Sequence, residues 1–240
     1  MYRLYCIAFL ILSFTPSWSQ TKVEKLINTQ QLRPAILYWD FGSIETIYPS
    51  EDSLGRYWNV IHRSLEPEQE TDGYDYYKMD SQTLRPLVSE MNHPGFIHYL
   101  IRFEKQQAAI QFKNSEDTVS YHLPLPEFVT PEGPGSPAFW GSLPLASGFE
   151  LEYDELDRWA GKDKIKGILV RKKLRVTGVE TLDIDAKKCP AYKMEVTSTL
   201  GSNLTVWVMK EAPHYWLKVI YKLSPDRTMK SAVTRLFLMK

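Results

Sequence analysis

The sequence predicts an all-β protein built from consecutive antiparallel strands, and three observations lead to this prediction. Apolar and polar residues alternate with period two along most of the chain, as they do in strands that bury one face. Turn-forming Asp, Asn, Gly and Pro residues separate the alternating segments at short intervals. Helical character is limited to two short stretches, around 23–32 and 154–159. We therefore expect a mainly β fold with few short helices.

The first 19 residues have the composition of a secretory signal peptide. Arg3 precedes an apolar run of about a dozen residues, and Ser17 and Ser19 place small side chains before a cleavage site at Gln20. The alternative is a buried N-terminal helix. We expect residues 1–19 to be removed and residues 20–240 to form one domain that is periplasmic or secreted. No second apolar run approaches the length of a membrane span, so we expect no transmembrane anchor in the mature chain.

The first half of the domain, about 33–123, reads as a series of strands joined by short turns. Short connections favour antiparallel pairing between consecutive strands. A turn is expected at 49–52, and further turn-formers follow the later strands. The strands are expected at 35–48, 56–65, 73–79, 84–91, 96–104, 107–113 and 117–123.

A segment rich in proline and glycine, 124–148, divides the domain. Proline removes a ladder donor and fixes φ, so this segment is expected to be a crossover between two halves of a sheet. Its aromatic pair, Phe139 and Trp140, has two interpretations. The rings can pack over the sheet as a lid, or they can fix the crossover to the core.

Alternation continues through the second half, 149–240. Strands are expected at 191–199, 203–209, 215–223 and 232–239. The hairpin at 206–223 is unusually aromatic, and Trp207, Met209 and Trp216 are expected to lie on one face of it. The basic tracts at 171–173 and 187–188 are interpreted as exposed charges.

Charge and cysteine content exclude several classes of protein. Lys and Arg total 29, as do Asp and Glu, so neither a nucleic-acid footprint nor a polybasic membrane patch is indicated. Cys6 belongs to the expected signal peptide, which leaves Cys189 without an internal disulfide partner. Cys189 is interpreted as a small, half-buried strand residue.

The sequence contains no recognisable catalytic, metal or cofactor motif. The five histidines show no metal-ligand spacing, and no nucleophile elbow or glycine-rich phosphate loop is present. We therefore predict no catalytic residues, no metal and no cofactor. Convergence of His98 and His122 with acidic side chains in one deep pocket would favour an enzyme, the hypothesis that we rank last.

The order of several segments resembles the DUF3108 family of exported bacterial proteins. The stretch 76–90, in which an aspartate precedes T-L-R-P, is similar to a strand of that family, and the hairpin at 206–223 is similar to one of its hairpins. Further similar segments are 103–112, 143–148 and 175–198. The resemblance implies a large curved antiparallel sheet or half-barrel of the LolA/LolB type, a fold that carries acyl chains. The helices that close such a half-barrel are not evident in this sequence.

These observations together predict a non-catalytic binding protein of the cell envelope. A curved sheet offers an apolar concave face, so a lipid or lipopeptide ligand is expected. The aromatic residues can equally be ordinary core between two layers of sheet. The alternative function is assembly with an envelope protein partner through the sheet edge or the aromatic hairpin. The candidate ligand-binding residues are Phe139, Trp140, Trp207, Met209 and Trp216.

Overall fold

The structure, a computed structural model, describes residues 23–64, 73–94, 97–113, 118–131, 133, 136–160, 165–201, 203–224 and 227–239. The expected signal peptide at 1–19 lies outside the described residues. Within them, the first half contains β1 (Ala35–Trp39), β2 (Ser43–Asp52), β3 (Gly55–Ser64), β4 (Tyr74–Asp80), β5 (Pro86–His93), β6 (Ile97–Phe103), β7 (Gln107–Lys113) and β8 (Thr118–Pro124).

The second half begins after a crossover that holds β9 (Thr130–Pro131) and the short helix α1 (Ser136–Gly141). Its strands are β10 (Glu150–Ala160), β11 (Ile165–Ile184), β12 (Lys187–Ser198), β13 (Asn203–Met209), β14 (Trp216–Ser224) and β15 (Arg227–Leu238). Two short 3-10 helices, η1 (Val23–Leu26) and η2 (Thr29–Gln31), precede β1.

All of these strands belong to one curved sheet. In the described part of the chain it has 15 strands in the order β8-β7-β6-β5-β4-β3-β2-β1-β15-β14-β13-β12-β11-β10-β9. Neighbours pair antiparallel, except that β9 runs parallel to β10. The pairing of β1 with β15 joins the two halves. Since β8 and β9 form its two ends, the backbone ladder is not closed. The predicted all-β fold with a large curved antiparallel sheet is therefore confirmed.

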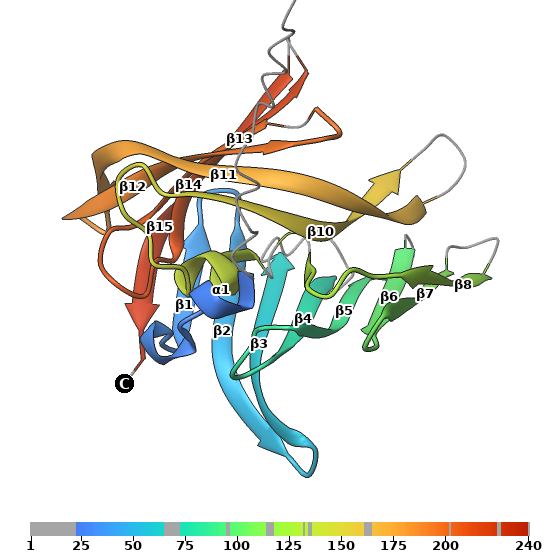
Figure 1. Cartoon of the computed structure of the whole chain (residues 1–240). Helices are drawn as coiled ribbons and strands as arrows, with labels where there is room; N and C mark the ends of the chain where they lie inside the picture. Colours follow the sequence, from blue (N-terminus) through green and yellow to red (C-terminus); the bar gives the residue numbers. More distant parts are fainter. Residues whose placement is uncertain are drawn as a thin grey trace, which may run out of the picture.

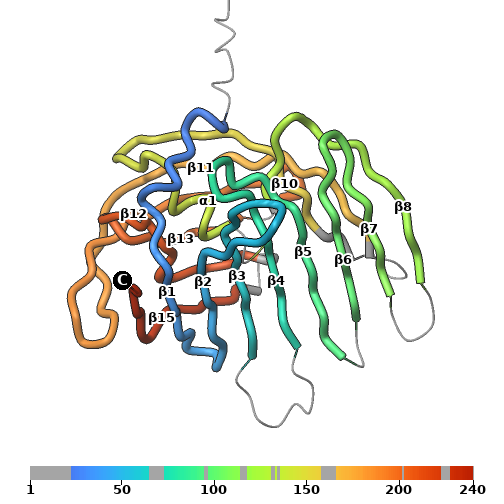
Figure 2. The backbone as a smooth tube through the Cα atoms, turned by 90° about the horizontal axis from the view of Figure 1, so that it is seen from below, coloured from blue at the N-terminus to red at the C-terminus, as the bar shows by residue number. Residues whose placement is uncertain are grey.

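The two halves of the sheet face each other across a buried core (Figures 1 and 2). Cross-strand register places Ile47, Val60 and Tyr77 side by side on the buried face of β2, β3 and β4. We call this the inner face. Helix α1 is entirely buried, and its Phe139 and Trp140 belong to the same core cluster as these three residues.

A second cluster fills the region between β6, β7 and β10. Ile110 and Tyr99 of the first half pack with Leu156 of the second half. The backbone N–H of Gly167 in β11 donates to the hydroxyl of Tyr121 in β8 at 2.7 Å. Side chains therefore join the two halves where no backbone ladder does.

Two expected features of the first half are wrong. The single strand expected at 35–48 is two strands, because the chain reverses at Asp40–Gly42, where Gly42 has a φ of 74° that favours glycine. The turn expected at 49–52 lies inside β2, and the hairpin bends instead after Asp52. The Leu54 N–H donates to the Asp52 carboxylate there at 2.8 Å, a local bond typical of tight turns.

The helix expected around 154–159 is also wrong, because these residues lie in β10. Leu151, Tyr153 and Glu155 alternate inward along this strand, and pairing with β11 over its whole length satisfies its backbone groups. The other stretch expected to be helical, 23–32, contains the two 3-10 helices.

Candidate ligand-binding site on the inner face of β2 to β5

Four ionisable side chains form a row across the inner face. Glu45 of β2 lies opposite His62 of β3, and His62 lies opposite Asp75 of β4. His93 of β5 continues the row, with its Nε2 atom 3.6 Å from Asp75 Oδ1. The row shares its face with Ile47, Val60 and Tyr77, because residues two apart in a strand point the same way. We call these four residues the polar row.

Glu45 is the buried end of the row. Its side chain has no exposed surface, and its Oε1 accepts a hydrogen bond from the indole N–H of Trp216 at 3.1 Å. The other carboxyl oxygen lies 3.9 Å from His62 Nδ1, too far for a hydrogen bond. Burial raises the pKa of Glu45 to about 8, although the Trp216 bond opposes the shift. At neutral pH this carboxyl group is therefore mostly protonated.

The two ends of the row differ in exposure, because Glu45 is fully buried whereas His93 reaches the surface. The exposed fraction of the side chain is 22% at His62, 15% at Asp75 and 42% at His93. Burial lowers the pKa of His62 despite the nearby charge of Asp75, so the environment favours the neutral ring. The row thus leads from a half-exposed imidazole to a fully buried carboxyl group.

Aromatic rings surround the buried end. Trp216 contacts Trp39 edge-on at 5.2 Å between ring centroids, and it contacts Trp140 of α1 at 5.8 Å. Phe41 stacks on His62 at 5.9 Å and lies 6.0 Å from Trp39. Since Phe41 is 51% exposed, it connects this aromatic cluster with solvent.

Buried polar atoms without a hydrogen-bond partner gather at this site. Within the described residues they include the Trp39 indole nitrogen and the Ser43 hydroxyl, which lie on paired positions of β1 and β2. They also include one polar atom from every member of the polar row. Most buried polar groups in proteins have partners, so this concentration marks the site as unusual.

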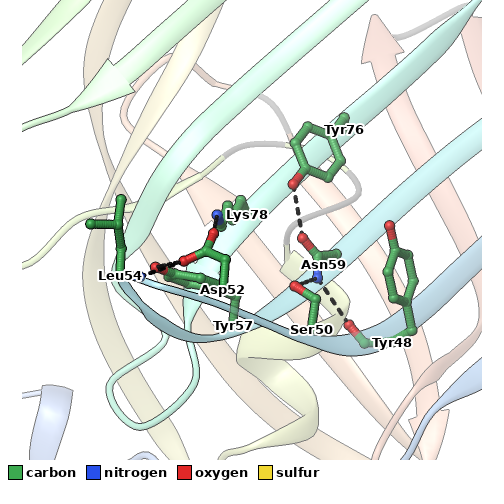
Figure 3. Close-up of polar contacts among 8 residues, drawn as sticks. All are labelled: Tyr48, Ser50, Asp52, Leu54, Tyr57, Asn59, Tyr76 and Lys78. Carbon is green, nitrogen blue, oxygen red and sulfur yellow. Dashed lines mark hydrogen bonds and ion pairs between the residues drawn. The ribbon is translucent and has the colours of Figure 1, made fainter.

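The outer face of the same strands shows the ordinary situation, with polar groups paired to one another (Figure 3). Asn59 donates to Ser50 Oγ at 2.7 Å and accepts from the Tyr76 hydroxyl at 2.8 Å. Asp52 accepts from Lys78 at 2.9 Å, and this bond is the main reason that its pKa falls to about 2. Among the described residues of these strands, the buried polar atoms that lack a hydrogen-bond partner all lie on the inner face.

A second buried acid lies on the inner face of the other half. Glu155 of β10 is 1% exposed and accepts a hydrogen bond from Lys172 of β11. Burial raises the pKa of Glu155 to about 7, while the lysine opposes the shift. Lys172 is itself buried and also lies 3.9 Å from Asp157. The expectation that the basic tract at 171–173 is wholly exposed is wrong at this residue, because Lys172 points inward beside Leu174.

The structure brings only some of the expected ligand-binding residues together. Trp140 and Trp216 are in contact, and Phe139 packs behind them on Tyr153 at 5.1 Å. Phe139 is 1% exposed, so the aromatic pair of the crossover fixes α1 to the core and does not form a lid.

The alternation predicted that Trp207, Met209 and Trp216 share one face of the hairpin. This prediction is wrong. Trp216 lies opposite Val208, whose side chain points away from that of Trp207, and a register shift separates the two positions. Lys218 and Lys193 lie over the Trp207 ring, 4.5 and 5.4 Å from its centroid, on the face that carries Glu180. Met209 is half-buried opposite Ala191.

Sequence reasoning missed the polar row. Glu45 occupies an inward position in the run 43–47, but an acid there resembles any charge on an alternating strand. Only the register across β2, β3 and β4 shows that Glu45, His62 and Asp75 are neighbours. Acidic and histidine residues at inward positions of consecutive strands are the one signal that was available.

His98 and His122, which were considered as convergent residues, lie apart. They face Lys113 and Ala109 of β7, four residues apart along that strand, which corresponds to roughly 13 Å. His98 lies instead 2.8 Å from Glu90. In the part of the chain that the structure describes, no three His, Cys, Asp or Glu side chains are placed to hold a metal ion. Cys189 is half-buried, and burial raises its pKa.

Comparison with known proteins finds few similarities. No family model matches the chain, and no curated protein matches it. One solved structure, a beta-barrel-like protein of the domain of unknown function DUF1849 from Brucella abortus, aligns with 89% of this chain and all of its own. The two share 10% identity at a TM-score of 0.49, so no function is transferred. Within the described ranges, no helix has the length and apolarity needed to cross a membrane.

Proposed function

We propose that this protein is a non-catalytic binding protein that holds an amphiphilic ligand, with an apolar body and a polar head, on the inner face of its curved sheet. The observation that carries the proposal is the group of unpartnered buried polar atoms along the polar row and at Trp39 and Ser43. They lie directly beside an aromatic cluster.

The free-energy cost of these atoms supports a binding role. Each buried polar atom that lacks a partner costs about 1–3 kcal/mol of stability. A polar head that hydrogen-bonds to several of them removes part of this cost only when it is bound. Unsatisfied groups of this kind therefore favour a ligand that brings complementary donors and acceptors.

Phe41 provides a surface for the apolar part of the ligand. Phe41 is half-exposed and contacts His62 and Trp39, near the buried Glu45 end of the polar row. Covering the exposed part of such a ring contributes about 1–2 kcal/mol to binding. An alkyl or lipid-like chain fits this requirement, as does the acyl part of a lipopeptide.

The first experiment is mass spectrometry of material extracted from the purified protein, together with titration of amphiphiles followed by tryptophan fluorescence. Phe41→Ala should weaken binding by about tenfold, because it removes an apolar contact of about 1–2 kcal/mol. The matched control is Leu54→Ala, since Leu54 is 89% exposed at the tip of the β2–β3 hairpin and should have no effect. The proposal fails if nothing is extracted and no amphiphile changes the fluorescence.

Export belongs to the proposal as well. The signal-peptide pattern at 1–19 supports a periplasmic or secreted location, where a carrier of amphiphiles would meet envelope lipids. Cell fractionation should find the protein outside the cytoplasm with a mature N-terminus near residue 20. Retention of the intact N-terminus in the cytoplasm would contradict this part.

A second candidate function is assembly with another envelope protein by strand addition. In the sheet order, β8 is an end strand of seven residues, whereas β9 at the opposite end has two. An edge of this length can accept a partner strand. The aromatic hairpin supports this function less, because Trp207 and Trp216 are buried. Capture of a partner that Ser120→Pro abolishes, without loss of amphiphile binding, would favour assembly.

A further inference from the structure

The two buried glutamates of the inner face differ in one respect, which is the presence of a cation. Glu155 has Lys172 within hydrogen-bonding distance. Among the described residues, no lysine or arginine lies within ion-pair distance of Glu45. The imidazole of His62, whose pKa is lowered by burial, lies 3.9 Å from one of its carboxyl oxygens. Both carboxyl groups are almost completely removed from solvent. The chain thus supplies its own ammonium group at one site and none at the other.

We propose that the polar row binds an organic cation, a primary ammonium group on an apolar body, whose nitrogen takes beside Glu45 the position that Lys172 Nζ takes beside Glu155. This inference rests on the proposed function and names the chemistry of the ligand's head.

The unpartnered atoms of the row suit an ammonium group. Glu45 Oε2, Asp75 Oδ1 and Ser43 Oγ can all accept hydrogen bonds, and an ammonium group carries three donors. His62 can accept through its unprotonated ring nitrogen. Hydrogen bonds between an ammonium group and a carboxylate are about twice as strong as neutral ones.

The charge of the row disfavours the opposite kind of ligand. It contains two carboxyl groups, and His93 Nε2 lies near only one of them, Asp75. A fatty-acid carboxylate placed here would lie beside acidic groups, and none of the lysine and arginine residues that the structure describes forms an ion pair with the row. An alcohol of the same length could form hydrogen bonds but would gain no charge interaction. The row should therefore rank ligands in the order amine, alcohol, carboxylate.

Access to Glu45 follows from the difference in exposure between the two ends of the row and from Phe41. The row reaches solvent through the side chains of His93 and Asp75, and Phe41 lies over His62. An ammonium head that reaches Glu45 would keep its alkyl body near Phe41 and Trp39, which contact each other. Head and body thus have adjacent surfaces of matching chemistry.

The test compares three ligands with the same alkyl chain, octylamine, octanol and octanoate, by calorimetric titration of the full chain at pH 7. Octylamine should bind at least about tenfold more tightly than octanol, which is the expected gain from a buried charge pair. Glu45→Gln should abolish that preference, so that octylamine binds no more tightly than octanol to the variant. Gln retains an oxygen that can accept from Trp216, so the variant should fold.

Glu90→Gln is the matched control, because Glu90 lies on the outer face of β5 paired with His98. It should keep the full preference for the amine. Asp75→Asn is a second variant, to be used if Glu45→Gln does not fold. It should reduce the preference for the amine by about threefold, a smaller effect, because Asp75 is more exposed than Glu45.

Proton release provides a readout that does not depend on any variant. With a pKa of about 8, Glu45 must ionise when the ammonium binds at pH 7, so the proton of its carboxyl group passes to the buffer. Other groups that face or continue this site are His62 of β3, Asp75 of β4, His93 of β5 and Tyr215, which directly precedes β14. Burial raises the pKa of Tyr215, which stays protonated. Titrations in buffers of different ionisation enthalpy should show nearly one proton released for octylamine and none for octanol.

The outcomes separate the inference from the proposed function. If octanol or octanoate binds as tightly as octylamine, or if Glu45→Gln retains the preference, the proposal of a cationic ligand is wrong. The proposed amphiphile-binding function is then still supported. If none of the three ligands binds, both are wrong.

Discussion

Glu45 and Glu155 are both buried glutamates, and they differ in whether a cationic side chain neutralises the carboxyl group. Each is buried at an inward position of a strand. Glu45 belongs to β2 and Glu155 to β10, two strands that lie in different halves of the sheet (Figure 1). Glu155 is paired with a buried lysine, whereas Glu45 has an indole donor and a distant imidazole. The comparison teaches that burial alone does not identify a site. Each carboxyl group leaves one oxygen without a hydrogen-bond partner. What identifies the region of Glu45 is the lack of a cation together with the unpartnered atoms of the neighbouring residues in the polar row.

The largest expected effect on stability comes from removing the cation beside Glu155, which makes its environment resemble that of Glu45. Lys172→Met removes the cation and leaves a buried carboxyl group, which should destabilise the protein by about 3–5 kcal/mol in urea unfolding at pH 8. Lys173→Met is the control, because Lys173 lies on the opposite face in an exposed pair with Glu150, and its effect should be too small to resolve. Equal effects of the two substitutions would contradict the buried pair.

The next effect concerns the pH dependence of Glu45. Its pKa rises from 4.5 in the unfolded chain to about 8 in the folded protein, so the folded state binds more protons between these values. The free energy of unfolding should therefore fall as pH rises from 4.5 to 8 and then level off. Glu45→Gln removes this contribution, so between pH 4.5 and pH 7 it should gain on the order of 3 kcal/mol relative to wild type.

Urea titrations of both proteins at several pH values measure this difference. Glu155 titrates in the same window, with a pKa of about 7, but it is present in both proteins and cancels. A constant difference between pH 5 and pH 9 would show that Glu45 has an ordinary pKa.

A smaller effect tests whether the two halves enclose one interior. A methyl group added at Gly167 would lie 2.6 Å from Ile110 Cδ1 and 2.9 Å from the Tyr99 hydroxyl. Gly167→Ala should destabilise the protein by about 1–3 kcal/mol, measured by thermal unfolding. Gly178→Ala should be tolerated, because no atom lies within 4 Å of the added carbon. If Gly167→Ala is equally neutral, β11 does not pack against β6 and β7.

The smallest effect concerns a paired acid on the outer face. Lys78→Met should raise the pKa of Asp52 from about 2 toward its usual value near 4, because the bond to Lys78 is the main cause of the shift. A side-chain NMR titration measures this change, and the stability of the protein should not change measurably. An unchanged pKa would show that the hairpin backbone, through the Leu54 N–H, holds the carboxylate without the lysine.

Much of the fold could be predicted from the sequence because alternation is a local property. Most strands of the first half lie within a few residues of their expected positions, and the crossover at 124–148 separates β8 from β10. The errors arose where one sequence pattern is compatible with two kinds of secondary structure. At Asp40–Gly42 a turn follows a strand with apolar residues on both sides, and in β10 a run of acids and aromatics resembles a helix segment.

The candidate site was predicted less well for a physical reason. Trp140 and Trp216 do meet, but Trp207 lies on the face that carries Lys193 and Lys218. A register shift between β13 and β14 changes which side chains share a face, and composition does not reveal such a shift. Residues chosen for aromatic character were therefore divided between two faces.

By itself the sequence determined the class of fold, because side-chain alternation and turn residues act within a few positions of the chain. Only the tertiary structure decided which charges are buried and which of them are paired. Glu45 and Trp216 are 171 residues apart, and Lys172 is indistinguishable in the sequence from its exposed neighbours. Burial and pairing depend on the packing of one half of the sheet against the other, so they emerge only when distant strands are brought together.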